Sequence, residues 1–108
     1  MARQSRSITN IKLVNLLVFL RGLPPLSSLT GDEERLLFAI YGALQNHSEL
    51  SVSDVYELVA DKSAASAYRR LMSLQKKGLV HIGIDDFDKR RRRIALTKAA
   101  DNFFASFP

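Results

Sequence analysis

Arginine and lysine side chains form two dense groups in the second half of the chain, and phosphate binding is the chemistry that they favour. Lys89-Arg90-Arg91-Arg92-Arg93 is an unbroken basic run, and a second group lies between residues 62 and 77. Residues 62–93 hold ten bases and three acids, whereas residues 32–61 hold seven acids and one base. This segregation indicates a placed binding surface for a polyanion, most often a nucleic acid, rather than an aid to solubility.

Catalysis and metal binding have few residues to work with. The chain has no Cys, which excludes disulfides, thiolate nucleophiles and Cys-based zinc sites. Its two histidines, His47 and His81, are far apart in sequence and neither lies beside a nucleophile motif. Gly-rich phosphate-binding loops are also missing from the sequence. We therefore expect no enzyme activity, no metal and no cofactor.

The elements that must position the bases follow from caps and periodicity. A chain of 108 residues fits one domain. A Thr with a Glu three positions later predicts a capping box, and three further Ser or Thr residues precede helical patterns. The helix that carries the second basic group, between residues 62 and 77, follows a tight connection at Asp61-Lys62 and ends at Gly78. The predicted N-caps are Thr30, Ser51, Ser63 and Thr97.

A first helix is predicted from a cap at Ser7 or Thr9 to about Arg21, where Gly and Pro residues stop it. Its apolar residues occupy more than one face, so we expect it to be buried on several sides, most simply by a second subunit. The apolar stretch covers roughly 20 Å, short of the ~30 Å core of a bilayer. Charge interrupts it, and no cleavage site follows. We expect no membrane association and a cytoplasmic, nucleoid location.

After Gly78 the period changes from helical to alternating. Residues 79–84 and 91–96 read as two strands, and Asp85-Asp86-Phe87-Asp88 between them has turn chemistry. The order is helix, helix, short turn, helix, hairpin, helix. This order predicts a mainly α winged helix-turn-helix domain with a small β-hairpin wing, an N-terminal dimerisation helix and a short C-terminal helix.

The third helix of that domain is then the recognition helix, which lies in the major groove of DNA. With Ala64, Ala67, Leu71 and Leu74 facing inward, its outward face has small residues near the start and Arg69 as a candidate for bidentate guanine contact. A solvated basic face is the alternative interpretation. The candidate DNA-binding residues are Ser63, Ala65, Ser66, Tyr68, Arg69, Arg70, Ser73, Lys76 and Lys77.

The hairpin is the second candidate DNA-binding element. Arginine at the tip of a β-ribbon suits a narrow minor groove, where the negative potential is enhanced. An edge strand kept in solution by its charge is the alternative. The acids of the turn pair with these arginines or serve only as turn residues. The candidate wing residues are Asp88, Lys89, Arg90, Arg91, Arg92 and Arg93.

The stretch Asp88-x-Arg90-x-x-x-Ile94-x-Leu96-Thr97 resembles the wing signature of the MarR family of multiple antibiotic resistance regulators. Leu74-x-x-x-Gly78-Leu79-Val80 is similar to the way that family leaves its recognition helix. The resemblance covers residues 29–100. It implies that Arg90 enters the minor groove with Asp88 as its orienting partner, and that Ser66, Tyr68 and Arg69 read bases.

Two departures from the family pattern stand out. Ala100 occupies a position where the family usually has Gly. The family dimerises through long helices at both ends, whereas about ten helical residues follow Thr97 here, which puts the family's small-molecule pocket in doubt. The three C-terminal phenylalanines either line such a pocket or form dimer core, and we expect the latter. The expected dimer interface consists of Ile8, Ile11, Val14, Leu17, Val18, Phe103, Phe104 and Phe107.

These observations predict a double-stranded DNA-binding transcriptional regulator, a repressor, that binds a pseudo-palindromic site as a homodimer. Residues 1–29 are expected to dimerise, residues 30–97 to bind DNA and residues 98–108 to complete the dimer. A small-molecule effector remains a further candidate partner. The alternatives are a winged-helix protein-interaction module and a plasmid or phage accessory protein for partition or replication.

Overall fold

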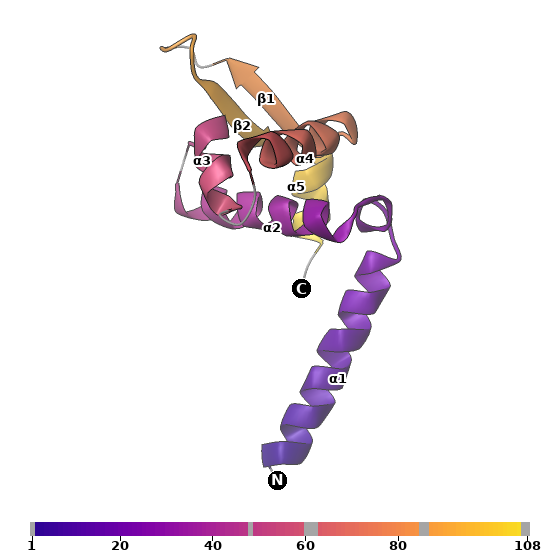
Figure 1. Ribbon diagram of the computed structural model, residues 1–108. Helices are drawn as coiled ribbons and strands as arrows, with labels where there is room; N and C mark the ends of the chain where they lie inside the picture. The colour runs from indigo at the N-terminus through magenta and orange to yellow at the C-terminus, as the bar shows by residue number, and fades with distance from the viewer. Residues whose placement is uncertain (1, 48, 60–62, 85–86, 107–108) are drawn as a thin grey trace.

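The computed structural model describes residues 2–47, 49–59, 63–84 and 87–106, with side chains from residue 10 onward. Its elements are α1 (Ala2–Arg21), the 3₁₀ turn η1 (Leu26–Ser28), α2 (Gly31–Asn46), α3 (Val52–Leu58), α4 (Ala64–Lys76), β1 (Val80–Ile84), β2 (Arg92–Leu96) and α5 (Lys98–Ala105). Helices α2 to α5 pack around the base of the hairpin, and α1 projects away from them (Figure 1). This order confirms the predicted winged helix-turn-helix. The connection expected at Asp61-Lys62 lies outside the described residues.

The predicted caps are confirmed because each depends on residues only three positions apart. The Thr30 hydroxyl accepts from the Glu33 N–H, and the Glu33 carboxylate accepts from the Thr30 N–H, which completes a capping box at the start of α2. A second reciprocal box starts α3. Single side-chain caps start α4 and α5. These three caps are Ser51, Ser63 and Thr97.

Gly78 turns the chain from α4 into β1. Its φ of +80° lies in the left-handed region, where a side chain would strain the backbone. The Leu79 N–H donates to the Leu74 carbonyl at 3.0 Å, which satisfies the end of α4 and brings β1 directly beside it. Helix α4 and the hairpin are therefore joined by a tight turn.

One apolar core holds α2, α3, α4, the hairpin and α5 together. The inward stripe of α4, Ala67, Leu71 and Leu74, is fully buried in this core. Ala64 was expected in that stripe and is exposed, because it is the first residue of α4 and lies beyond the edge of the core. The other core side chains come from every packed element: Leu36, Leu37, Ile40, Leu50, Val55, Leu79, Val80, Ile94, Ala100 and Phe104.

The hairpin is antiparallel and is attached to the helical body at its base. Val80 pairs with Leu96, Ile82 with Ile94, and Ile84 with Arg92. Beyond this pairing, Ser51 forms an isolated bridge to Arg93. The Ile94 N–H also donates to the Leu50 carbonyl at 2.7 Å. The segment before α3 therefore continues the sheet and fixes the hairpin against the body.

Helix α1 differs from the prediction at its start. It begins at Ala2, so Ser7 and Thr9 lie inside the helix rather than capping it. Ser and Thr cost only a few tenths of a kcal/mol in a helix interior, and the residues before them are good helix formers. A cap residue alone was therefore a weak signal for this boundary.

The apolar side chains of α1 are not covered by the rest of the chain. Ile11, Val14 and Val18 are 59%, 57% and 66% exposed, and Phe19 is 63% exposed. The burial predicted for this helix is thus not provided within one chain. The side chain of Ile8 lies outside the described residues. No helix in the described part of the chain is long and apolar enough to cross a membrane.

One of the C-terminal phenylalanines differs from the prediction. Phe104, expected at a dimer interface, is 5% exposed and belongs to the core of its own chain. Its ring stacks on Tyr41 with a centroid distance of 4.0 Å and meets Phe38 edge-to-face at 5.6 Å. Phe103 is half-buried against the same core. Phe107 lies outside the described residues.

Phe104→Ala is expected to lower the free energy of unfolding by about 3–5 kcal/mol, because it removes a buried ring and leaves a cavity. Phe87→Ala is the matched control, since Phe87 is 94% exposed and its loss should change stability by less than about 0.5 kcal/mol. Urea unfolding followed by circular dichroism at one protein concentration measures both. Equal stability of the two variants would place Phe104 outside the core.

Candidate nucleic-acid interface

The first half of α4 presents a polar, exposed face. Ser63 caps the helix by accepting from the Ser66 N–H at 3.2 Å, and the two hydroxyls are also 3.2 Å apart. The guanidinium of Arg69 lies 3.4 Å from the Ser66 hydroxyl, one turn further on. Small Ala65 and the 39% exposed Tyr68 flank this pair. Hydroxyl and guanidinium groups therefore stand together on an accessible helix face with little bulk around them.

Three other polar residues of α4 and its end, expected to contact DNA, form bonds to α2 and to the segment before it. The Lys77 ammonium donates to Glu33 at 2.7 Å and to the Ser28 carbonyl at 2.8 Å. The Ser73 hydroxyl also donates to Glu33. Arg70 lies 3.3 Å from Asp32 and its side chain is only 19% exposed. These bonds hold α4 on α2, and the DNA contacts expected for the three residues remain predictions.

Glu33 is the acceptor at the centre of this attachment, and its charge is strongly favoured. Burial raises the pKa of Glu33, but hydrogen bonds from Lys77, Ser73 and the Thr30 N–H outweigh that effect and lower it to about 2. The carboxylate is therefore ionised at neutral pH although its side chain is only 6% exposed. An ionised, multiply bonded Glu33 ties the end of α4 to the start of α2.

The hairpin is bonded both to α4 and to the segment before α3. The Gln75 side chain of α4 accepts from the Ile82 N–H at 3.0 Å. Arg93 of β2 pairs with Glu49 at 3.0 Å. Arg93 was expected in the DNA-binding wing, and this pair, together with the Ser51–Arg93 bridge, ties it to the segment before α3. The orientation of the hairpin relative to α4 is therefore fixed.

The wing residues before β2 and at its start are exposed: Asp88, Lys89, Arg90, Arg91 and Arg92. Asp88 was expected to orient the Arg90 side chain. Its carboxylate accepts from the Arg90 backbone N–H at 3.0 Å, and its carbonyl accepts from the Arg91 N–H at 3.0 Å. Asp88 thus shapes the turn that presents the arginines. The other two acids predicted for this turn, Asp85 and Asp86, lie outside the described residues.

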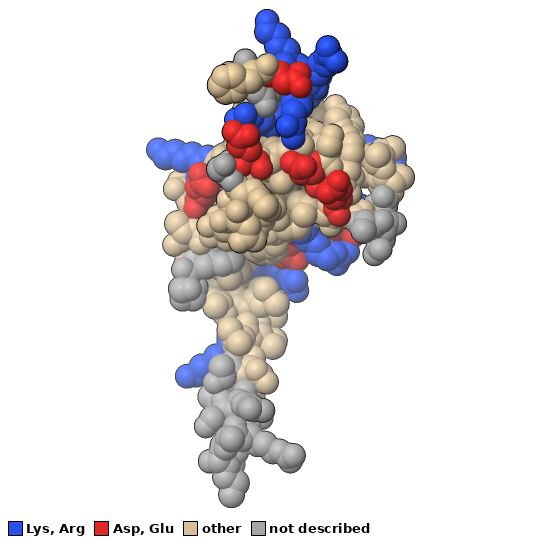
Figure 2. Space-filling model, turned by 90° about the vertical axis from the view of Figure 1, so that its left-hand side faces the viewer, with Lys and Arg blue, Asp and Glu red and all other residues tan. Residues whose placement is uncertain are grey.

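Charge is separated on the surface as the sequence indicated. Figure 2 shows Lys and Arg side chains gathered at the free end of the hairpin, with most of the Asp and Glu side chains of that face below them on the body. This end of the molecule lies opposite the free end of α1 (Figure 1). The positive charge of this face is therefore concentrated at the wing end of the body.

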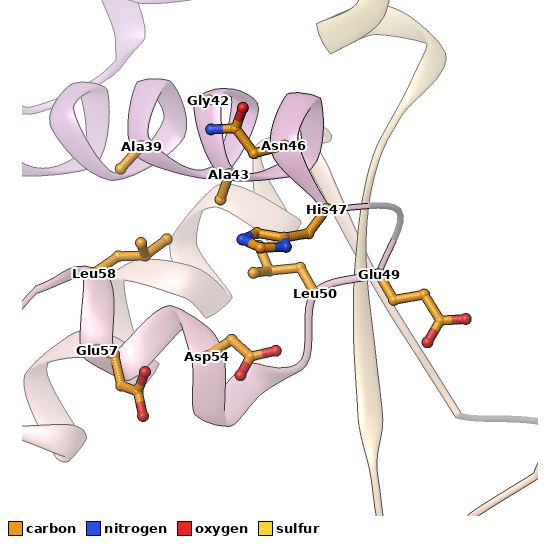
Figure 3. Close-up of a pocket in the computed structure, with 10 residues that line it drawn as sticks. All are labelled: Ala39, Gly42, Ala43, Asn46, His47, Glu49, Leu50, Asp54, Glu57 and Leu58. Carbon is orange, nitrogen blue, oxygen red and sulfur yellow. The ribbon is translucent and has the colours of Figure 1, made fainter.

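A hollow of about 770 Å³ lies between α2 and α3. The imidazole of His47 extends into it beside Ala43 and Leu50, while Glu49 points away (Figure 3). Its described lining comes from α2, α3 and the segment between them, and includes no residue of α4, the hairpin or α5. Within the described residues, no group of three or more His, Asp or Glu side chains is placed to hold a metal ion.

Sequence reasoning missed the side chains that hold the candidate interface in place. Gln75, Glu49 and Glu33 each bond to residues of another element. The Glu33–Lys77 pair joins residues 44 positions apart. Helical periodicity assigns a residue to a face and gives no partner for it. The acids concentrated in the first turn of α2 were the one visible signal, and they read there as ordinary capping chemistry.

No protein-family profile matches the chain, and no curated protein matches it in sequence. Several solved structures do resemble it. FabT from Streptococcus pneumoniae, in complex with DNA, is 20% identical with a TM-score of 0.66, over 96% of this chain and 68% of that one. MepR from S. aureus, in a DNA-binding conformation, is 21% identical with a TM-score of 0.64, over 98% and 72%. A mutant MarR from E. coli, complexed with operator DNA, is 20% identical with a TM-score of 0.61, over 94% and 66%.

These likenesses confirm that the chain has the winged-helix fold of MarR-family regulators. The chain spans 66% of the E. coli MarR chain and 56% of the MepR chain in a MepR–DNA complex. At these low identities the likeness concerns the fold. The roles of individual residues in binding remain predictions.

The lowered pKa of Glu33 predicts that the fold loses stability in acid. Because its folded pKa of about 2 lies below the ordinary value of 4.5, its ionised form stabilises the fold above pH 4.5, and that contribution is lost as the pH falls from 4.5 toward 2. When the pH is lowered from 5.5 to 2.5, the free energy of unfolding of the wild type should therefore fall by on the order of 2 kcal/mol more than that of Glu33→Gln.

Urea unfolding at the two pH values gives this difference directly. Glu57→Gln serves as the control, because Glu57 is an exposed carboxylate of α3, and it should follow the wild type. A Glu33→Gln variant that loses as much stability as the wild type would show that Glu33 makes no such contribution.

Proposed function

We propose that this chain is a double-stranded DNA-binding transcription regulator, a repressor, that acts as a homodimer on a pseudo-palindromic site. The observation that carries the proposal is the fixed juxtaposition of two exposed, DNA-compatible elements. The Ser66–Arg69 face of α4 adjoins an arginine-bearing hairpin that is bonded to α4 through Gln75. The resembling folds solved with DNA support this assignment.

In this proposal α4 enters the major groove and reads bases. The guanidinium of Arg69 reaches the O6 and N7 acceptors of a guanine, and the Ser66 hydroxyl donates or accepts beside it. Tyr68, Ala65 and Ser63 lie at the same end of the helix and contact the neighbouring base edges or backbone. Lys76, exposed near the other end of α4, neutralises a phosphate.

The hairpin contacts the flanking minor groove. Arg90 enters that groove, where the narrow walls enhance the negative potential. Lys89, Arg91 and Arg92 neutralise phosphates on either side, which adds affinity that is independent of sequence. Asp88 keeps the turn in the shape that presents them, through its bonds to two backbone N–H groups.

A second copy of the chain covers α1 in the proposed homodimer. Large apolar side chains exposed along one helix exceed what a monomer usually leaves in water, and twofold pairing is the commonest way to bury them. Residues 1–29 therefore form the dimerisation unit and residues 30–97 the DNA-binding unit. Residues 98–108 contribute the half-buried Phe103 to the same interface.

Arg69→Ala should reduce sequence discrimination by about 1–3 kcal/mol, because a bidentate base contact has that value. A binding site selected from a random duplex library with the full chain supplies the specific DNA, and its scrambled version supplies the reference. Fluorescence anisotropy then measures both affinities. Arg35→Ala is the matched control, since Arg35 is an exposed arginine of α2 that pairs within its own helix.

The outcome that would contradict the assignment is an equal loss of affinity for both duplexes in Arg69→Ala. A library from which the wild type enriches no sequence would overturn sequence-specific binding altogether.

Val18→Asp should convert the dimer into a monomer, because it places a charge in the apolar interface proposed for α1. Asn10→Asp is the control, since it puts the same charge at a polar position of that helix. Sedimentation velocity gives the oligomeric state. Affinity for the full palindrome should fall by about tenfold or more in Val18→Asp, while affinity for a single half-site is retained. A wild-type chain that sediments as a monomer at micromolar concentration refutes the homodimer.

A further inference from the structure

The first turn of α2 contains three consecutive acids. Each of them pairs with a base from another part of the chain. Glu34 pairs with Arg21 at the end of α1, and Glu33 pairs with Lys77 after α4. Asp32 pairs with Arg70 in the middle of α4. We call Asp32, Glu33 and Glu34 the acidic turn. Two helices far apart in the sequence are thus attached to one turn of a third.

The attachment of α1 is bidentate. The Nε and Nη2 atoms of Arg21 each donate to a different carboxylate oxygen of Glu34 at 2.9 Å. The Glu34 side chain is 11% exposed, so the pair is partly shielded from water. Two parallel hydrogen bonds between planar groups restrain orientation as well as distance. Because Arg21 is the last residue of α1, this pair acts at the point where α1 leaves the body.

The attachment of α4 includes the linker that follows α1. The Lys77 ammonium bonds to Glu33 of the acidic turn and also to the Ser28 carbonyl of η1. Leu26 of the same 3₁₀ turn is 4% exposed and anchors the linker in the body. The connection between α1 and α2 is therefore held on both sides, by a buried side chain and by the end of α4.

We propose that the acidic turn sets the direction of α4 relative to α1 and thereby the spacing between the two half-sites that a dimer reads. The inference rests on the proposed function, because it requires pairing through α1 and recognition through α4. A dimer that pairs through α1 has its twofold axis beside that helix. The angle between α1 and the body then determines how far apart the two copies of α4 lie.

The geometry of DNA makes half-site spacing sensitive to the angle between α1 and the body. Half-sites one helical turn apart are separated by about 34–36 Å over 10–10.5 base pairs, so each added base pair changes both distance and rotation. Helix α1 has 20 residues and is about 30 Å long, so a small rotation at Arg21 displaces its far end by several ångströms. A restrained joint therefore gives a sharp spacing preference, and a loosened joint gives a broad one.

Arg21→Gln and Arg35→Gln form a matched pair for the test. Both remove one positive charge and one ion pair to the first turn of α2, but the Arg35 pair lies within α2 whereas the Arg21 pair joins two elements. The double variant Arg21→Glu/Glu34→Arg restores an ion pair with reversed charges and keeps the net charge. The full chain is used throughout.

Affinity is measured for palindromes whose half-site spacing varies in steps of one base pair, and for a single half-site. The wild type is expected to prefer one spacing by about tenfold or more over neighbours displaced by two base pairs. Arg21→Gln should reduce this preference to about twofold, with unchanged affinity for the single half-site. Arg35→Gln should keep the wild-type preference, and the charge-reversed double variant should recover most of it.

A second readout does not use DNA. Because the chain has no cysteine, a spin label at Ala64→Cys reports one position per protomer, on an exposed residue outside the proposed DNA contacts. The distance between labels in the dimer should be narrowly distributed in the wild type and the charge-reversed variant. It should be broad in Arg21→Gln.

The failures of the two proposals are distinguishable. A wild type with a clear spacing preference that Arg21→Gln keeps, with equally narrow distances, overturns the role of the acidic turn and leaves the proposed function intact. A wild type that prefers no palindrome, or whose spin labels show no dipolar coupling between protomers, overturns the proposed function and this inference with it.

Discussion

The arrangement of the whole molecule depends on the burial of one stripe of α4. Ala67, Leu71 and Leu74 are fully buried in the core formed with α2, α3 and the hairpin. Once that stripe is fixed inward, the rotation of α4 about its axis is fixed as well, and Ser66 and Arg69 must face outward. The polar bonds to Glu33 and from Gln75 then set its position along the neighbouring elements. The proposed recognition face is thus a consequence of core packing.

The charge pattern of the chain serves two different purposes. The acids at the start of α2 compensate bases of α1 and α4 inside the molecule, and Glu49 does the same for Arg93. The exposed bases gather on the hairpin, where bound phosphates would relieve their mutual repulsion in the proposed complex. A count of charges along the sequence therefore overestimates the basic surface offered to DNA.

Helix α1 differs from α4 because its apolar side chains are exposed rather than buried in the core. Its apolar residues are exposed around the helix, and it is attached to the body near its last residue, Arg21. In the proposed homodimer, association through α1 covers these residues and positions two proposed DNA-binding units at once. Dimerisation and recognition are mechanically linked in this account because both helices are attached to the acidic turn.

Local signals predicted much of the fold, and long-range packing decided the rest. The caps at Thr30 and Ser63 and the turn at Gly78 were read correctly because the residues that form them lie within a few positions. The same spacing rules could not tell that Phe104 stacks on Tyr41 rather than on a second subunit. Nor could they tell that Lys77 binds an acid 44 residues away. In both cases composition and periodicity gave the correct face or charge and left the partner undetermined.

Hydroxyl-radical footprinting of the full chain on a duplex selected from a random library tests the central claim most directly. The account predicts protection that is symmetric about the centre of the site. Backbone protection should flank two major-groove segments about one helical turn apart, with minor-groove protection outside each of them where the hairpins lie. A footprint restricted to one half-site, or protection spread evenly along the duplex, would contradict a homodimer that reads DNA through α4 and the hairpin.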